Sequence, residues 1–362
     1  MSNKKAFKEL VDKATVADTL PATQYGDFQA QLIDLGEAPS QTELHCRVSM
    51  SDEMERAVEV KHRTRELVGN MMEDVRLGKP ISVGPVREVA QELTESMFRN
   101  KDAILSLSLL KEKDEYTYMH SVNVGVFLIS FCNTLGVDPA TTIEAGIGGI
   151  LHDIGKMRTS PEVLNKEGKL TDEEFNEMRM HVTHGYNILK GSDEIPEIAK
   201  NICYEHHERW DGSGYPRGLK GDEISRFGLM AAIVDVYDAI TSDRCYHKGM
   251  NPHVALQKMT EWSAYHFNKE LFFQFVQCVG IYPTGSLVRL KNDLIGVVMH
   301  NHPKSLLHPV VNIIIDAKKR TKLKPRQVDL MAMQKQDPDY VIAEHELPKK
   351  WGVNPRMFVT QP

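Results

Sequence analysis

The sequence predicts a mainly α-helical fold with small β-containing segments toward both ends of the chain. Residues 102–278 are predominantly helical in pattern. After Cys278 the pattern changes to β-branched runs separated by turn residues, and a weaker alternation precedes the first helix. A chain of 362 residues can hold two or three domains and bury at least one full hydrophobic core.

The first hundred residues predict an N-terminal accessory region, spanning 1–100. Two alternating runs, 28–33 and 43–48, indicate a β-rich piece. A helix is expected from Ser51 to Leu77, since a Ser-Asp-Glu sequence can cap its start. Two proline-containing breaks follow, and a second helix is expected from Val86 to about Asn100.

Five predicted helices in the middle of the chain carry candidate functional side chains. The third opens with Thr-Asp-Glu-Glu, which is a good signal for a helix start. A loop rich in glycine and proline separates the last two. The predicted helices are Asp114–Leu135, Pro139–His152, Thr171–Leu189, Ile195–Glu208 and Arg226–Ser242.

Three β-branched runs near the C-terminus predict a small sheet or partial barrel. They lie at 286–290, 295–299 and 310–315. The sequence therefore predicts a helical domain over 101–280 and a small β-rich extension over 281–362.

Composition and charge exclude several classes of protein. The 41% hydrophobic and 26% charged residues are typical of a soluble globular protein. A formal net charge of −6 supplies no basic stripe for a nucleic acid polymer, so an anionic substrate would need metals or a few placed cations. No apolar run reaches the roughly 18 residues of a membrane span, and the N-terminus lacks the apolar core of a signal peptide. Five distant cysteines fit reduced thiols, which predicts a cytoplasmic protein.

The segment Gly149–Lys156, at the end of an apolar helix, organises the rest of the sequence. Its His152 and Asp153 would be buried side by side, which is costly unless a cation lies against both. A metal centre is the usual solution, and helical bundles build such centres from facing helices. The candidate ligands are five imidazoles and two carboxylates: His120, His152, Asp153, His181, His206, His207 and Asp235.

This set is too large for one ion and suits two. In one arrangement the carboxylate of Asp153 bridges two groups of ligands. The first group is His120, His152 and Asp235, and the second is His181, His206 and His207. Ligands with nitrogen and oxygen but no thiolate fit iron, manganese, nickel or zinc, and we expect iron ahead of manganese. Each residue alone also fits an ordinary core or surface role, although a lone Asp235 in an apolar helix would be stranded.

Three separated motifs resemble the HD-GYP branch of the HD phosphohydrolase superfamily. They are His152-Asp153-Ile154-Gly155-Lys156, then His206-His207-Glu208 with Asp211-Gly212-Ser213-Gly214-Tyr215-Pro216, and a closing segment at 235–244. The match covers about residues 100–260. The resemblance implies a helical HD-type catalytic domain that hydrolyses cyclic dinucleotides, chiefly cyclic di-GMP, to the linear dinucleotide and on to GMP.

The resemblance also implies residue roles. The seven candidate ligands match the metal positions of the family. Lys156 and Arg244 match groups that contact the substrate phosphate, and a surface ion pair of Arg244 with Asp238 or Asp243 is the ordinary alternative. In the family's loop, Gly214 allows the turn, Pro216 stiffens it, and Tyr215 would stack on a base or bond a phosphate.

Two positions depart from the family's pattern. Members with three metals carry a glutamate four residues before the first histidine, whereas this chain has Tyr116, so we expect two metals. A basic residue often lies three positions after the family's arginine, where this chain has His247. Asp114, two positions before Tyr116, is interpreted as a proton acceptor near the metal-bound water.

Two ions about 4 Å apart can share a hydroxide, a strong nucleophile at neutral pH, and can polarise a phosphoryl oxygen. Two alternatives stay open: a catalytically weak cyclic-dinucleotide receptor or interaction module, and another HD-type nucleotide phosphohydrolase. No residue distinguishes cyclic di-GMP from a mixed cyclic GMP-AMP. Diguanylate-cyclase-type signalling proteins are possible partners.

Overall fold

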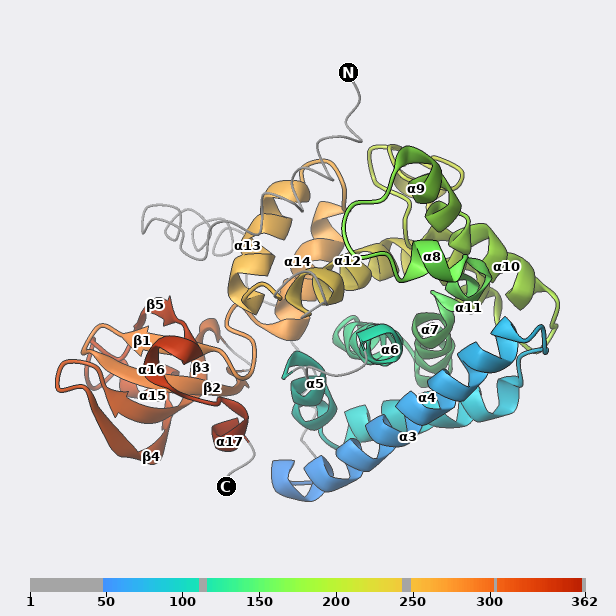
Figure 1. The fold of residues 1–362 in the computed structure, drawn as a ribbon. Coiled ribbons are helices and arrows are strands. Elements are labelled where there is room, and N and C mark those ends of the chain that lie inside the picture. Colours follow the sequence, from blue (N-terminus) through green and yellow to red (C-terminus); the bar gives the residue numbers. More distant parts are fainter. Residues whose placement is uncertain (1–47, 111–115, 243–248, 303–304, 360–362) are drawn as a thin grey trace.

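The computed structural model describes residues 48–110, 116–242, 249–302 and 305–359. They form a helical body followed by a five-stranded antiparallel sheet with short helices (Figure 1). The predicted mainly α-helical class with a β-rich C-terminal segment is confirmed. The strands expected near the N-terminus lie outside the described residues, except for Val48, which lies in a bend.

The helical body contains two long lead-in helices and then a series of shorter ones. Ser49 caps the first, because its hydroxyl accepts a hydrogen bond from the Asp52 amide. In chain order the elements are α3 (Met50–Arg76), α4 (Val83–Arg99), α5 (Lys101–Leu109), α6 (Tyr116–Thr134), α7 (Pro139–Leu151), η1 (Ile154–Arg158), α8 (Pro161–Leu164), α9 (Asp172–Arg179), α10 (His181–Lys190), α11 (Glu197–Glu205), η2 (Gly221–Glu223), α12 (Arg226–Thr241), α13 (Pro252–Trp262) and α14 (Lys269–Val279).

One predicted helix, Thr171–Leu189, is in fact two. Thr171 and Glu174 form the expected capping box at the start of α9. The amide of Met180 then donates to the carbonyl of Glu177, three residues back, and α10 begins at His181. This tightened turn ends the first helix, since α-helical bonding needs a partner four residues back. The break places His181 in the first turn of a new helix.

The C-terminal sheet has the strand order β4-β3-β2-β1-β5. The three predicted runs fall in β1, β2 and β3, whereas β4 and β5 were not predicted. Strand β4 is exposed over most of its length and contains Pro325, which is tolerated because β4 lies at an edge. The elements are β1 (Leu287–Leu290), β2 (Leu294–His302), β3 (Ser305–Asp316), β4 (Thr321–Asp329), α15 (Leu330–Met333), β5 (Ile342–Glu346), α16 (Pro348–Trp351) and α17 (Arg356–Val359).

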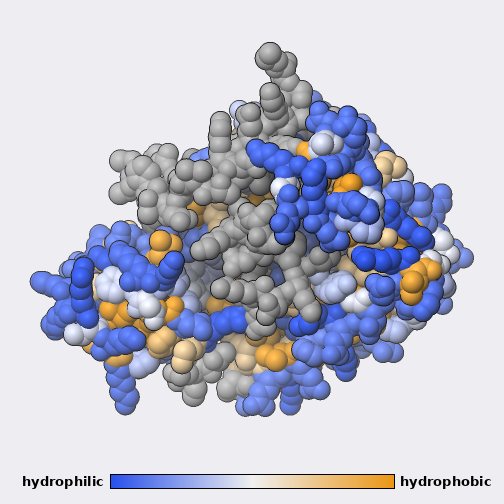
Figure 2. Space-filling model, viewed as in Figure 1, coloured by the Kyte–Doolittle hydropathy of each residue, from blue (hydrophilic) through white to orange (hydrophobic). Residues whose placement is uncertain are grey.

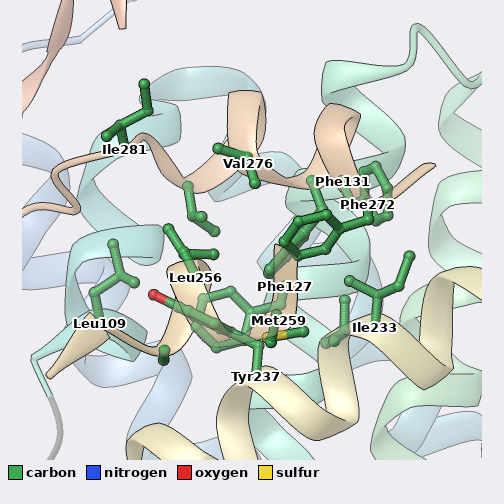
Figure 3. Close-up of a cluster of buried hydrophobic side chains, with 14 of the residues drawn as sticks. Leu109, Phe127, Phe131, Ile233, Tyr237, Leu256, Met259, Phe272, Val276 and Ile281 are labelled. Atoms are coloured by element: carbon green, nitrogen blue, oxygen red, sulfur yellow. The ribbon is translucent and has the colours of Figure 1, made fainter. Parts of the chain in front are cut away.

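Two large apolar clusters hold these elements together. One contains the aromatic side chains Phe127, Phe131, Tyr237 and Phe272, together with residues of the sheet (Figure 3). The other joins α3 and α4 to α6 and α7. The lead-in helices and the sheet therefore share cores with the central helices, and the predicted boundaries at residues 100 and 280 stay predictions.

Helices α6 and α7 approach each other closely enough for their backbones to touch. A Cβ atom added to Gly149 would lie 2.7 Å from the Cα of Gly125, so neither helix tolerates a side chain there. This contact brings the helix that carries His120 against the helix that ends at His152. In the view of Figure 2, polar residues cover most of the coloured surface. Within the described ranges, no helix has both the length and the apolar character needed to cross a membrane.

Candidate metal centre

All seven predicted ligands converge in the interior of the helical body. They come from five places in the chain that are far apart in sequence. Six are buried, and His207 is half-buried. They are His120 on α6, His152 and Asp153 directly after α7, His181 at the start of α10, His206 and His207 directly after α11, and Asp235 on α12.

The carboxylate of Asp153 lies between two groups of imidazoles. Its Oδ2 is 3.2 Å from Nε2 of His152 and 3.6 Å from Nε2 of His120. Its Oδ1 is 3.3 Å from Nε2 of His181 and 3.9 Å from Nε2 of His206. One carboxylate oxygen therefore faces each group, which is the geometry that a bridging ligand needs.

The carboxylate of Asp235 also faces both groups. Its Oδ1 is 3.0 Å from Nε2 of His120, and its Oδ2 is 3.9 Å from Nδ1 of His207. The sequence analysis placed Asp235 with the first group alone. In the structure Asp235, on α12, lies between the two groups of imidazoles. Asp153, between α7 and η1, does the same.

Three of the imidazoles are oriented by backbone carbonyls three residues earlier in the chain. Nδ1 lies 2.7 Å from the carbonyl of Gly149 in His152, 2.6 Å from that of Met178 in His181, and 2.9 Å from that of Cys203 in His206. A carbonyl oxygen only accepts, so each Nδ1 carries the proton. The Nε2 lone pair of each ring then points into the centre, as in metal-binding histidines.

Asp238 orients the fourth ring, that of His120, and sequence reasoning missed this role. Its Oδ2 lies 2.7 Å from Nδ1 of His120, and its Oδ1 accepts from the amide of Asn123 at 3.1 Å. From the sequence, Asp238 was considered only as a surface partner for Arg244, whereas in the structure Asp238 is fully buried. Its position three residues after Asp235 in an apolar helix was the available signal.

The charge states within the centre suit a cation. Burial lowers the pKa of His181 to about 4 and that of His206 to about 3, so both rings are neutral at pH 7. Burial alone would raise the pKa of Asp153, but Lys156 and the neighbouring imidazoles hold it well below its usual range. Neutral imidazoles and ionised carboxylates are the protonation states that bind metal ions.

The hydrogen bonding of the centre is incomplete without a further group. Nε2 of His152 and Oδ1 of Asp153 are buried, and neither has a hydrogen-bond partner among the described residues. Both atoms nevertheless lie within 3.3 Å of other polar atoms of the cluster. Polar atoms that are close together but misaligned for hydrogen bonds are expected where they share a cation. A donor set of imidazole nitrogen and carboxylate oxygen therefore fits divalent metal ions.

His120 is the exception to the neutral pattern. Burial alone would lower its pKa, but hydrogen bonds to Asp235 and Asp238 raise the pKa to about 9. Binding a metal at Nε2 therefore requires His120 to lose the proton that faces Asp235 there, while Nδ1 keeps the proton that it shares with Asp238. A cation at that position would replace the proton as the partner of Asp235.

Lys156 lies at the edge of the same cluster. Its ammonium group contacts Oδ2 of Asp153, and its side chain is partly exposed. The sequence analysis expected this cation to contact a substrate phosphate. Its present contact is with the bridging carboxylate, where it helps to keep Asp153 ionised.

The loop that carries Tyr215 covers the half-buried side of the centre. The Tyr215 ring stacks on His207, with 4.7 Å between ring centroids and 27° between planes. Gly214 is required there, since a Cβ atom would lie 2.4 Å from the amide nitrogen of Arg209. The buried carboxylate of Glu208 accepts hydrogen bonds from the Arg217 amide at 2.8 Å and the Leu219 amide at 3.0 Å, which fixes the far side of the loop.

The remaining predicted site residues lie either in the loop that carries Tyr215 or outside the described residues. Pro216 follows Tyr215 in the same loop. Asp114 and Arg244 lie outside the described residues, as does His247. Their predicted roles, like the assignment of each ligand to one ion, stay predictions.

Comparison with known proteins places this geometry in a family. Residues 105–271 match the model of an HD domain, and residues 287–345 match that of a KOW domain associated with HD domains. The chain is 42% identical over 285 residues to "Cyclic di-GMP phosphodiesterase PA4108" of Pseudomonas aeruginosa, a match that covers 79% of this chain and 69% of the relative.

Two further matches are less similar in sequence. "3'3'-cGAMP-specific phosphodiesterase 2" of Vibrio cholerae is 38% identical over 187 residues, which cover 51% of this chain and 34% of the relative. The solved structure of Bd1817, an HDG"Y"P protein from Bdellovibrio bacteriovorus, has the same fold, with a TM-score of 0.52 at 18% identity. That match covers 70% of this chain and 78% of the solved one. The chain belongs to the HD-GYP family of HD-domain proteins.

Proposed function

We propose that this protein is a metal-dependent phosphodiesterase that hydrolyses cyclic dinucleotides, with cyclic di-GMP as its main substrate. The observation that carries the proposal is the pair of buried carboxylates, Asp153 and Asp235, each of which faces two groups of imidazoles. Such an arrangement suits two ions side by side. The names of the relatives in Pseudomonas and Vibrio support the substrate class.

A pair of divalent ions supplies an activated water and neutralises charge on the phosphoryl oxygens when it is bound. The protein's own contribution is positioning. His120, His152, Asp153 and Asp235 would hold one ion, and His181, His206 and His207 the other, with both carboxylates between them. The carbonyls behind three of the rings and Asp238 behind the fourth fix these side chains before substrate arrives.

Lys156 and Tyr215 would act at the substrate side of this centre. The ammonium of Lys156 could shift from Asp153 to a phosphate oxygen, because its side chain is partly exposed. Tyr215 would present its hydroxyl while its ring stays on His207. Burial raises the pKa of Tyr215, so its hydroxyl keeps its proton and can donate a hydrogen bond. We keep Arg244 as a second phosphate contact and Asp114 as the proton acceptor on the strength of the family resemblance alone.

The decisive experiment is turnover by the metal-loaded protein under reducing conditions. Cyclic di-GMP and mixed cyclic GMP-AMP would each be incubated with protein loaded with iron, manganese, nickel or zinc, and products separated by chromatography. We expect cleavage of cyclic di-GMP to the linear dinucleotide or GMP. Tight binding without any product would instead identify a receptor.

Asp153→Asn is the sharpest variant for this test, since it keeps the shape and removes the bridging charge. We expect kcat to fall by at least ~10³-fold, because a lost ligand between two ions removes most of the charge stabilisation. Asp193→Asn, on an exposed turn, is the matched control and should leave turnover unchanged. Full activity of Asp153→Asn would contradict the proposal.

The proposal also covers the metal, the partners and the location of the protein. Iron is proposed because imidazole and carboxylate ligands without thiolate suit it. Diguanylate-cyclase-type proteins are proposed partners, since they make the proposed substrate. A cytoplasmic location is consistent with Cys132, Cys203 and Cys278, which are free thiols.

A further inference from the structure

Arg179 lies beside the candidate metal centre, although no sequence motif pointed to it. It is the last residue of α9, directly before the turn that separates α9 from α10. Its guanidinium carbon is 4.4 Å from the centroid of the Tyr215 ring. Because Tyr215 itself stacks on His207, one aromatic ring separates Arg179 from a candidate metal ligand. The break at Met180 is therefore what brings this cation to the site.

Arg179 has no anionic partner in the part of the chain that the structure describes. Among the described residues, no hydrogen bond or ion pair joins its side chain, although that side chain is half-buried. Other partly buried arginines have carboxylates: Arg99 is 2.7 Å from Glu53, and Arg289 is 2.5 Å from Glu346. A cation removed from water without a counter-ion is costly, so its place at the site calls for an external anion.

A second guanidinium, that of Arg209, adds to the positive charge around Tyr215. Burial lowers the pKa of Arg209, and the charge of Arg179 acts in the same direction. Arg209 also contacts Ser213 in the loop, at 3.5 Å. Asp211 offsets part of this charge, since it acts on Arg209 in the opposite direction. Asp235 and Asp153 of the centre also face Tyr215, and on the loop side of that ring Arg179 and Arg209 place two positive charges next to the metal centre.

The chemistry of the proposed substrate requires such a region. A cyclic dinucleotide carries two phosphodiester groups, and only one of them can react at a metal pair at a time. The second keeps its negative charge and needs a separate partner. Lys156 lies against Asp153, at the metal centre itself, so Lys156 would serve the reacting phosphate and not the second one.

We infer that Arg179 binds the second, non-reacting phosphate of a cyclic dinucleotide, with Arg209 adding positive charge and Tyr215 holding the guanidinium in place. The inference rests on the proposed function. A guanidinium presents two parallel N–H donors that match two phosphate oxygens. Its stacking on Tyr215 limits the positions that the guanidinium can take, so the side chain loses less conformational freedom when it binds a phosphate. Arg179 is thus a specificity residue for substrates with two phosphates.

The test compares two substrates that differ in the second phosphate. Cyclic di-GMP has two phosphodiesters, whereas bis(p-nitrophenyl) phosphate has one. For Arg179→Gln we expect KM for cyclic di-GMP to rise by ~10-fold or more, the effect of losing one charge-assisted hydrogen-bond pair. Its kcat should change little, and kinetics on bis(p-nitrophenyl) phosphate should match the unmodified protein. Arg179→Lys should recover part of the loss, since the charge stays but the fork is lost.

Arg158→Gln is the matched control, because Arg158 also ends a short helix near the centre but is exposed. It should leave both substrates unaffected. Equal losses on both substrates for Arg179→Gln would mean that Arg179 only supports the loop, and an unchanged KM would mean that it does not bind substrate. Either result overturns the inference.

Failure of the proposed function is a separate outcome. It would appear as an unmodified, metal-loaded protein that cleaves bis(p-nitrophenyl) phosphate but no cyclic dinucleotide. In that case calorimetric Kd values for cyclic di-GMP, measured with the unmodified protein and Arg179→Gln, still test the inference. Weaker binding by the variant supports the second-phosphate contact, and equal binding overturns it.

Discussion

The metal centre and the adjoining aromatic core share two helices and similar burial but have opposite chemistry. Helix α6 carries both His120 and Phe127, and α12 carries both Asp235 and Tyr237. Tyr237, Phe127 and Phe275 pack edge to face, with centroids 5.2–6.3 Å apart. The aromatic core packs through apolar rings, and its single buried hydroxyl among these residues, that of Tyr237, has no hydrogen-bond partner in the described structure. The centre instead brings imidazoles and carboxylates together, with unpartnered polar atoms within 3.3 Å of other polar atoms. Stability should therefore come from the first region, and dependence on a ligand from the second.

Truncation in the aromatic core should have the largest effect on stability. Phe127→Ala removes a fully buried ring, and we expect the free energy of unfolding to fall by about 3–5 kcal/mol. Denaturant unfolding followed by circular dichroism measures this change. Phe175→Ala, at an exposed site, should have little effect. A small loss for Phe127→Ala would mean that this cluster contributes less than its burial suggests.

Metal removal should destabilise the centre while leaving the aromatic core intact. An ion that binds only the folded protein stabilises it by about 2.7 kcal/mol at a hundred times its Kd. We expect Tm to rise when manganese or iron is added to chelator-treated protein. Asp153→Asn should lose most of that increase. The same increase in both proteins would place the ion elsewhere.

Substitution of the residue behind His120 should weaken metal binding without removing a ligand. Asp238→Asn keeps the volume but loses the charge that holds the His120 ring, and we expect metal affinity to fall by about 10–100-fold. Isothermal titration calorimetry of metal into the metal-free protein measures this change. Asp222→Asn, at an exposed position of η2, is the control. Unchanged affinity would show that His120 is held by its other contacts.

The smallest expected effect concerns a buried histidine far from the centre, where α13 meets the sheet. His253 donates from Nδ1 to the carbonyl of Ile281 at 2.8 Å and stacks on Tyr282, with His345 of β5 nearby. Burial lowers the pKa of His253 from 6.5 to about 4. The unfolded chain therefore binds a proton at higher pH than the folded one, so stability falls as pH drops below about 6.5.

The slope from this one residue approaches about 1.4 kcal/mol per pH unit between those two pKa values. Urea unfolding at pH 7.0 and at pH 5.5 should show His253→Gln losing less stability on acidification than the unmodified protein. His62→Gln, at an exposed site, should behave like the unmodified protein. Equal pH dependence in all three would exclude His253 as the cause.

Much of the candidate ligand set was predictable because metal ligands must be particular residue types, several of them within or next to apolar helices. His152 and Asp153 follow an apolar helix, and Asp235 interrupts another, so burial of polar groups was visible in the pattern. Asp238 was misjudged because its neighbour three residues back already accounted for a carboxylate in that helix. Whether Asp235 faces one group or two depends on the direction of its side chain, which no spacing reveals.

The sequence by itself determined the helical class, three of the five C-terminal strands and the identity of the seven converging side chains, because periodicity and residue chemistry are local properties. Only the tertiary structure decided that α9 ends at Arg179, two residues before His181, and that Arg179 then comes to lie over Tyr215. The turn at Met180 and the loop at Tyr215 are more than thirty positions apart in the chain. Their contact depends on how the helices pack around the centre, which local patterns do not encode.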